Sequence, residues 1–365
     1  MSQATSRYAL LKDLSASASS DQRRELLRTV TDALTNNART PSEAEFAELD
    51  QILSLAASEY STQVRTEFAQ LVAASVSRFC HASEQFAMDD IEVAMPVLRN
   101  SQALTEEALL RVVTEKSQAH LLAVTKRDNV SPRVSEALVS NGSDEVVSSL
   151  LANERALISD ATYEVVAKRA ETSKLLQAPL VRRQGVPIDL LNDLYLKVEK
   201  DLRQEIVKKF DTVPPAELEK AFERSRARVT TAFRRMPDDV ALAQKRLSLI
   251  EANLQLLPQV LPSLLREGKS SRTVFKMAFA RLVDVSYDVI EPAVDGSDID
   301  TLALLCRGAN FDRSLFVTLA IGLDTSEKGL GRAEEFGTLY ESVPVVAAQR
   351  ALRFWKVREI GKSVV

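Results

Sequence analysis

The feature that most constrains the fold of this chain is a segment that recurs within it. VAMPVLRNSQALTEEALLRVV (93–113) aligns without a gap with VVSSLLANERALISDATYEVV (146–166), with 8 identities in 21 positions at an offset of 53. Half-way between them, NVSPRVSEALV (129–139) matches the second part of the pattern at an offset near 26, and GVPIDLLNDLY (185–195) is a degenerate further copy. Self-similarity at a short fixed period predicts a solenoid.

Each copy reads as a pair of short helices, because apolar residues recur at three- and four-residue spacing. The structural repeat positions that we expect to be equivalent are Asn100, Leu104, Asn153 and Leu157. Asparagine tolerates the left-handed conformation that ends many helices, so the first helix of each pair is predicted to end near it. Each leucine precedes a residue suited to cap the second helix, Thr105 or Ser159, and is expected to staple onto that helix.

Composition supports the same architecture. Of 365 residues, 45% are hydrophobic but only 5% are aromatic, with ten glycines and twelve prolines. These values exclude collagen-like, low-complexity and wholly disordered chains, and they disfavour β-sandwiches and barrels. The sequence therefore predicts an all-α, HEAT/armadillo-like helical-repeat solenoid at 1–210, clearest at 90–195, in which Leu, Val and Ala fill uniform layers.

A break follows at DTVPP (211–215), because two consecutive prolines disfavour helix. Beyond it we expect a C-terminal all-helical domain, 211–365. The predicted helices there are about 215–235, 238–256, 271–291, 298–306, 312–322, 328–341 and 344–357. Upstream of the repeats, Thr40 suits the N-cap of a helix whose apolar face includes Phe46, Leu49 and Leu53.

The cysteines and the apolar stretches of the sequence indicate the cellular compartment. Cys80 and Cys306 are far apart and fit a reducing environment. The first residues lack an apolar run of signal-peptide length, and the longest uncharged stretch, 252–265, is too short and too polar to cross a bilayer. We expect a cytoplasmic protein without a transmembrane segment.

Three segments resemble a family of uncharacterised alphaproteobacterial proteins, the domain of unknown function 2336. They are DIEVAMPVLRNSQALTEEALLRVV (90–113), LLANERALISDATYEVVAKRA (150–170) and DIDTLALLCRGANFDRSLFVTLAIGL (298–323). The likeness covers most of the chain and is strongest at 40–200. It implies a cytoplasmic bacterial protein with HEAT-type helical repeats. The family has no established activity, so the resemblance supplies no catalytic residues.

Residues suited to catalysis are few. The two histidines, His81 and His120, are too few for a zinc site, and Cys80 and His81 are sequence neighbours that point about 100° apart on a helix. The acidic pairs Asp89-Asp90 and Asp298 with Asp300 precede apolar helical runs, so they are read as caps. No glycine-rich phosphate loop is present. We expect no enzyme activity, no cofactor, no metal and no small-molecule substrate.

The sharpest functional signal is charge. The net charge of −4 combines an acidic region at 1–90, with 13 acidic and 8 basic residues, and a basic one at 220–235, with six basic and one acidic. On the predicted helix at 215–235, Lys220, Arg224, Arg228 and Arg235 form a basic ridge opposite an apolar arc, and Arg182, Arg183 and the set Arg266, Lys269, Arg272 and Lys276 add further basic positions.

Three interpretations of this charge remain open. The ridge is either a solvated face or a docking surface for an acidic protein, nucleic acid or anionic membrane, and its arginines favour bidentate contact with carboxylate or phosphate. The leading hypothesis is a non-enzymatic protein–protein interaction scaffold or adaptor, since stacked helices present an extended surface. The alternative is binding of a nucleic-acid duplex backbone through the helix at 215–235. Pairing of the acidic and basic regions within a homo-oligomer is a further possibility.

Overall fold

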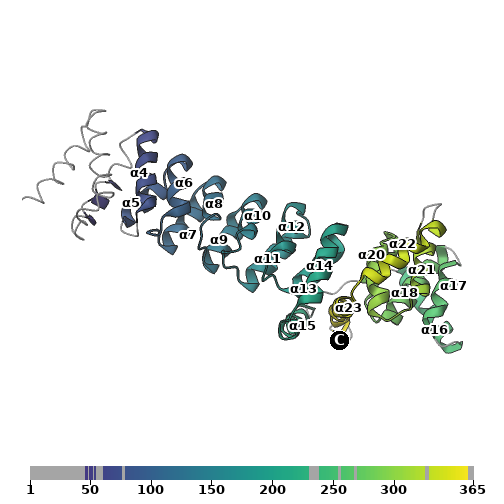
Figure 1. Cartoon of the computed structure of the whole chain (residues 1–365). Helices are drawn as coiled ribbons and strands as arrows, with labels where there is room; N and C mark the ends of the chain where they lie inside the picture. Colours follow the sequence, from purple (N-terminus) through teal and green to yellow (C-terminus); the bar gives the residue numbers. More distant parts are fainter. Residues whose placement is uncertain are drawn as a thin grey trace, which may run out of the picture. The chain divides into compact units, whose positions relative to one another are not determined.

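The computed structural model describes residues 46–47, 49–51, 53–54, 61–75, 79–229, 238–253, 256–266, 269–324 and 329–360. The regular structure of these residues is helical, with no strand among them, which confirms the predicted all-α class (Figure 1). The chain divides into two compact units, Met1–Gln184 and Gly185–Val365. The predicted N-cap Thr40 lies outside the described residues, whereas Leu49 and Leu53, from the apolar face expected after it, are fully buried.

The N-terminal unit is a succession of short helices. They are α4 (Thr62–Ala74), α5 (Cys80–Ala87), α6 (Ile91–Asn100), α7 (Glu106–Glu115), α8 (Gln118–Val124), α9 (Pro132–Asn141), α10 (Asp144–Ala152), α11 (Asp160–Ala170) and α12 (Lys174–Arg182). Helices this short are marginal in water by themselves, so their stability comes from packing.

These helices form two rows (Figure 1). In row A each of α4, α6, α8, α10 and α12 packs on the next, and in row B α7 packs on α9 and α9 on α11, with α5 leading into the row. The pairs α7–α8, α9–α10 and α11–α12 join the rows. Because each pair contacts its neighbours, the apolar faces of all of them form one continuous core. The fold is therefore that of a helical-repeat protein.

The rows explain the recurring sequence. The segment 93–113 covers α6 and α7, its copy at 146–166 covers α10 and the first part of α11, and the intermediate copy at 129–139 covers most of α9. In each helix the apolar residues of the repeat are buried in adjacent pairs, such as Val97 with Leu98 and Leu150 with Leu151. Two buried residues per turn give the helix a stripe that faces the core.

Capping at the row-B helices follows the prediction. The Thr105 side chain accepts a hydrogen bond from the backbone N–H of Ala108, and Ser159 does the same for Thr162. Both are therefore true N-caps, each satisfying one of the unpaired N–H groups at a helix start. The leucines that precede these two caps differ in burial. Leu104 is buried as predicted, but Leu157 is 62% exposed, because its neighbour Ala156 is the residue that is buried in that copy.

The two repeat asparagines lie at the ends of their helices, as predicted, but without the predicted backbone conformation. Asn100 is the last residue of α6, and Asn153 follows α10 with φ −86°, so neither adopts the left-handed conformation. Instead, the Asn153 side-chain amide donates to the carbonyls of Thr125 (2.8 Å) and Arg127 (2.7 Å), which follow α8. The prediction of a left-handed helix end was therefore wrong, and the Asn153 side chain instead satisfies carbonyls at the end of α8, the preceding helix of row A.

Arginines cap the other row-A helices in the same way. Arg127, which follows α8, donates to the carbonyls of Leu98 (2.5 Å) and Ser101 (2.6 Å) at the end of α6. Arg183, which follows α12, donates to the carbonyls of Leu151, Asn153 and Ala156 at the end of α10. Carbonyls at a helix C-terminus have no partner within the helix, so each clamp satisfies the preceding helix from the following one.

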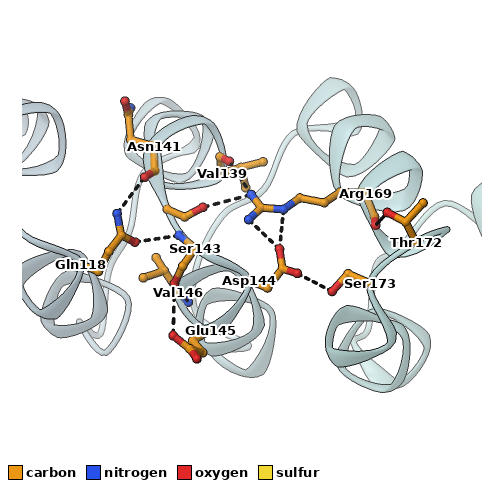
Figure 2. Close-up of polar contacts among 11 residues, drawn as sticks. Gln118, Val139, Asn141, Ser143, Asp144, Glu145, Val146, Arg169, Thr172 and Ser173 are labelled. Atoms are coloured by element: carbon orange, nitrogen blue, oxygen red, sulfur yellow. Dashed lines mark hydrogen bonds and ion pairs between the residues drawn. The ribbon is translucent and has the colours of Figure 1, made fainter.

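A polar network joins α8 to α12 at the opposite ends of these helices (Figure 2). Arg169 of α11 donates to the carbonyls of Val139 and Gly142 and pairs with Asp144 at the start of α10. The Gln118 side chain bridges the turn that follows α9, because it donates to the Asn141 carbonyl (3.0 Å) and accepts from the Ser143 N–H (2.7 Å). A Cβ on Gly142 would lie 2.4 Å from the carbonyl oxygen of Leu138, so this helix–helix turn requires glycine.

The C-terminal unit contains longer and more varied helices. They are α13 (Ile188–Leu194), α14 (Lys200–Thr212), α15 (Pro215–Val229), α16 (Asp238–Asn253), α17 (Leu261–Arg266), α18 (Lys269–Val283), α19 (Tyr287–Asp295), α20 (Ile299–Gly308), α21 (Arg313–Leu323), α22 (Ala333–Ser342) and α23 (Val345–Ile360), with 3₁₀ turns at Tyr195–Lys197, Pro258–Val260 and Gly329–Arg332. The helix predicted at 271–291 is two helices, because Asp284 has φ +61° and ends α18.

Helix α23 organises this unit. It packs on α13, α14, α15 and α20 and buries Phe354 and Trp355 completely. The Phe354 ring lies 4.3 Å from that of Phe222 (α15) and 5.7 Å from that of Phe210 (α14). Arg350 donates to three carbonyls at the end of α14, those of Phe210, Asp211 and Val213. Contacts between tilted aromatic rings and another arginine clamp thus join the first helices of the unit to its last one.

These contacts place the domain boundary earlier in the chain than the sequence predicted. The sequence predicted a break at 210/211, but residues 185–213 belong to the C-terminal unit. The diproline does separate two helices, α14 from α15. It does not separate domains, because α14 and α15 both pack on α23. In the part of the chain that the structure describes, no helix is long and apolar enough to cross a membrane.

Candidate functional site

The predicted basic ridge lies on α15. Leu218, Ala221, Phe222 and Ser225, which belong to the predicted apolar arc, are all buried. On the opposite side Lys220 is exposed to solvent. The Arg228 side chain and the whole of Arg235 lie outside the described residues.

Arg224 does not contribute a free charge to this ridge. Its guanidinium lies 3.2 Å from a carboxylate oxygen of Asp189, a residue of α13 that is 1% exposed. A buried carboxylate needs a partner, because an unpaired buried charge is strongly destabilising. The first role of Arg224 is therefore to neutralise Asp189. The sequence missed this pair because the two residues are on different helices.

Arg183 is not a surface residue at all. It is 4% exposed, and besides its helix-end carbonyls its Nε donates to the Tyr163 hydroxyl (2.7 Å). Its neighbour Arg182 is exposed, but belongs to the N-terminal unit, whereas Lys220 and Arg224 belong to the C-terminal unit. The inclusion of Arg183 in a docking ridge was therefore wrong, because backbone carbonyls use its donors.

Two other basic positions noted in the sequence are also engaged. Lys276 is 6% exposed and donates to Asp295 (2.6 Å), and Arg272 donates to the Val294 carbonyl (2.8 Å) and lies 3.5 Å from Asp295. Although burial opposes the charged form, the hydrogen bond that Lys276 donates to Asp295 raises the pKa of the lysine above its usual value. These side chains hold α18 on α19.

The two rows of the N-terminal unit differ in surface charge. Across the described helices of row A, the exposed charged side chains are Glu92, Glu145, Lys174 and Arg182. On α7, α9 and α11 of row B they are Glu107, Arg111, Glu115, Arg133, Glu136, Asp160, Glu164 and Lys168. Exposed large apolar side chains occur on both rows, for example Met95 on α6 and Val165 on α11. The shortage of charge from α4 to α10 therefore distinguishes row A.

Much of the charge on row B is already paired within the chain. Arg111 lies 2.7 Å from Glu84 of α5, and Arg133 lies 3.6 Å from Glu107 of α7. Each pair joins one row-B helix to its neighbour. Exposed pairs of this kind contribute little to stability. They do neutralise the row-B surface, which leaves fewer charges there to attract a partner.

A cleft of about 650 Å³ opens along one edge of row A, at the N-terminal ends of α6 and α8. Its carboxylates are those of Asp89, Asp90, Glu92 and Glu115, and Lys116 is the basic residue that lines it. Asp89 is held in a bidentate pair with Arg65 of α4, at 2.7 and 2.8 Å, and this hydrogen bonding raises the pKa of the Arg65 guanidinium. Asp90 occupies the N-cap position of α6 without making the predicted cap hydrogen bond.

His120 lies at the base of this cleft and has a structural role. It is 5% exposed, its Nε2 is 2.9 Å from the Asp89 carbonyl oxygen, and its Nδ1 is 2.8 Å from the Ser117 hydroxyl. One ring nitrogen donates to the carbonyl, so the other accepts from the serine. With both nitrogens occupied, the ring fixes α8 against the start of α6.

A second cleft, of about 640 Å³, lies within the C-terminal unit. Each of its basic residues is paired: Lys200 with Asp300 (2.9 Å), Arg203 with Asp298, and Arg332 with Asp324 (2.9 Å) and Glu335 (2.9 Å). Asp298 also caps α20, because it accepts from the Thr301 N–H, which confirms the predicted cap. These pairs join α14 to α20, and the end of α21 to the start of α22.

The remaining candidates for chemistry also have structural surroundings. Asp50 accepts from the backbone N–H groups of His81 and Ala82 and lies 3.0 Å from the His81 ring, so it caps α5. Cys80 is exposed and unpaired, and burial raises the pKa of the Cys306 thiol. Among the described residues, no three His, Cys, Asp or Glu side chains are grouped closely enough to hold a metal ion.

The fold therefore defines an all-α helical-repeat protein with a row of charge-poor helices. The family of uncharacterised proteins conserved in bacteria (DUF2336) matches residues 93–353, and the chain belongs to this family. No curated protein and no solved structure matches the chain.

Proposed function

We propose that this protein is a non-enzymatic interaction scaffold of the HEAT/armadillo-like type, acting in the cytoplasm, and that row A binds a segment of a partner protein. The observation that carries the proposal is the shortage of charge on α4, α6, α8 and α10 beside the charged row B. The cores of protein interfaces are depleted of charged residues, because desolvating a charge is costly.

The dimensions of row A suit an extended segment. Neighbouring helices pack about 8–10 Å apart. The three steps from α6 to α12 thus span roughly 25–30 Å, the length of about eight or nine extended residues. Met95 on α6, exposed by 36%, supplies a flexible apolar contact of the kind that adapts to varied partners.

The alternative, binding of a nucleic-acid duplex through α15, has less support. With Arg224 paired to Asp189 and Arg183 buried, the exposed basic side chain on α15 that remains for phosphate contact is Lys220, among the side chains that the structure describes. Duplex affinity depends on several cations acting together. Replacing Arg224 would therefore perturb the stability of α15 as well as any contact with DNA.

The two rows provide a matched test. Ala119 and Ala161 are both exposed, and both are the second residue of their helix, α8 in row A and α11 in row B. We expect affinity capture from native lysate to return a stoichiometric protein partner with the wild-type chain and with Ala161→Arg. Capture should fail with Ala119→Arg. Equal recovery by both variants, or repeated recovery of the bare protein, would contradict the proposal.

A further inference from the structure

Glu115 is in an electrostatically unfavourable position. It is the last residue of α7, where the helix dipole is negative, and the last turn of α7 has no basic residue to compensate. It is exposed, and no ion pair to Glu115 is formed by the residues that the structure describes. The fold gains nothing from a carboxylate at this position.

Glu115 shares the row-A cleft with Glu92 of α6. Glu92 is also exposed and makes no ion pair within the described part of the chain. Asp90, 77% exposed, lies 3.4 Å from Arg65, whose closer contacts are to Asp89. With the Asp89–Arg65 pair neutral and Lys116 positive, the charges that remain on Asp90, Glu92 and Glu115 make the cleft net negative. Row B, in contrast, neutralises Glu84 and Glu107 with its own arginines.

The cleft also continues the docking face. Its apolar lining comes from Met88 and Ile91, and Glu92 precedes the exposed Met95 by one turn on the same helix. An acidic cleft next to a charge-poor helix row is complementary to a segment that has cationic side chains at one end and small or apolar ones along the rest.

We infer that the partner of row A is a basic protein segment, and that a lysine or arginine of this segment enters the cleft between Glu92 and Glu115. This inference rests on the function proposed above and specifies its partner. The same carboxylates would repel nucleic-acid phosphates, so the complementary macromolecule is a polypeptide. Charge pairing at the cleft sets the register of the segment, and Met95, one turn beyond Glu92 on α6, contacts the part of the segment that follows.

A random dodecapeptide library displayed on phage, panned against the full-length protein, tests this directly. We expect the enriched peptides to carry at least two lysines or arginines. Their affinity should fall about tenfold in the double variant Glu92→Gln/Glu115→Gln, since each exposed charge pair contributes up to about a factor of five. The row-B variant Glu107→Gln/Glu136→Gln, which changes charge equally, should bind as the wild type does.

The outcomes separate the two proposals. Enriched peptides that lack basic residues, or that bind the Glu92/Glu115 variant as tightly as the wild type while Ala119→Arg abolishes binding, would overturn this inference and leave row A as a docking face. Peptides whose binding is weakened by neither the Glu92/Glu115 change nor Ala119→Arg, or a library in which no peptide is enriched, would overturn both proposals. Raising NaCl from 50 to 500 mM should weaken the predicted complex, and binding that is unaffected by salt would contradict a charged contact.

Discussion

At the scale of single residues, several arginines of this protein act as internal hydrogen-bond donors. Arg127, Arg169, Arg183 and Arg350 each donate to carbonyls at the end of another helix. The guanidinium suits this role because it offers five N–H donors in a fixed fork. Sequence alone ranked Arg182 and Arg183 together as basic positions. In the structure Arg182 is exposed, whereas Arg183 is buried and donates to carbonyl oxygens.

Arg183→Met should therefore destabilise the N-terminal unit by about 3 kcal/mol, because it leaves several buried carbonyls without a donor. Arg182→Met is the matched control. It removes the same charge from the adjacent, exposed position and should cost about 1 kcal/mol or less, because the contacts of an exposed charge contribute little. Urea denaturation followed by circular dichroism measures both changes. Equal losses of stability would show that Arg183 contributes only its charge.

Asn153 allows a sharper test of capping. If its role were a left-handed backbone conformation, Asn153→Gly would be neutral or stabilising. Asn153 has φ −86°, and its side-chain amide bridges two carbonyls. We therefore expect Asn153→Gly to destabilise the protein by about 1–2 kcal/mol. Asn153→Asp should be at least as harmful, since a carboxylate cannot donate. The same denaturation series decides between the two mechanisms.

At the scale of helices, the sequence predicted a large part of the structure. The caps Thr105 and Ser159 and most helices of the C-terminal unit follow from local rules that the chain obeys. The charge-poor row could also have been predicted from the sequence, by comparing the charged residues of alternate helices in the repeats. The contacts of Arg224 with Asp189 and of Glu115 with the α6 cleft were not, because they depend on which helices pack together.

Asp144 makes the junction of α10, α11 and α12 sensitive to acid. The hydrogen bond from Ser173, followed by that from Arg169, lowers the pKa of the Asp144 carboxyl below its usual value near 3.8. A carboxyl whose pKa is lowered by folding stabilises the protein above its ordinary pKa and loses this effect as pH falls through the folded value. We therefore expect Asp144→Asn to be less stable than wild type at pH 7.

This difference should shrink below about pH 4, where the wild-type carboxylate becomes protonated. Thermal unfolding at a series of pH values measures it, with Glu145→Gln as a control that removes one negative charge from the same helix. A stability difference between wild type and Asp144→Asn that stays constant down to pH 2 would contradict the assignment.

At the scale of the whole molecule, the domain boundary is the largest departure from the sequence prediction. The diproline at 214–215 marks a local break in helix, but the boundary depends on what α14 packs against. Its partner, α23, is more than a hundred residues away in sequence, so no local signal could have shown it. The helical-repeat fold was predictable because its contacts are between neighbours in sequence.

Arg350→Met tests the revised boundary. Without the clamp on Phe210, Asp211 and Val213, α14 should lose its hold on α23. Hydrogen exchange should then be faster throughout α14, while α6 to α10 stay as protected as in the wild type. Faster exchange across α6 to α10 would instead place α14 with the repeats, as the sequence had suggested.

The central claim is that the charge-poor face of row A is the docking surface. Carbodiimide-mediated labelling of surface carboxylates, with and without the captured partner, tests it directly. Bound partner should reduce labelling of Glu92 (α6) and Glu115 (the last residue of α7), which line the row-A cleft, several-fold, while Glu107 and Glu136 on row B should label as in the free protein. Protection of Glu107 and Glu136 with unchanged labelling of Glu92 and Glu115 would contradict the claim.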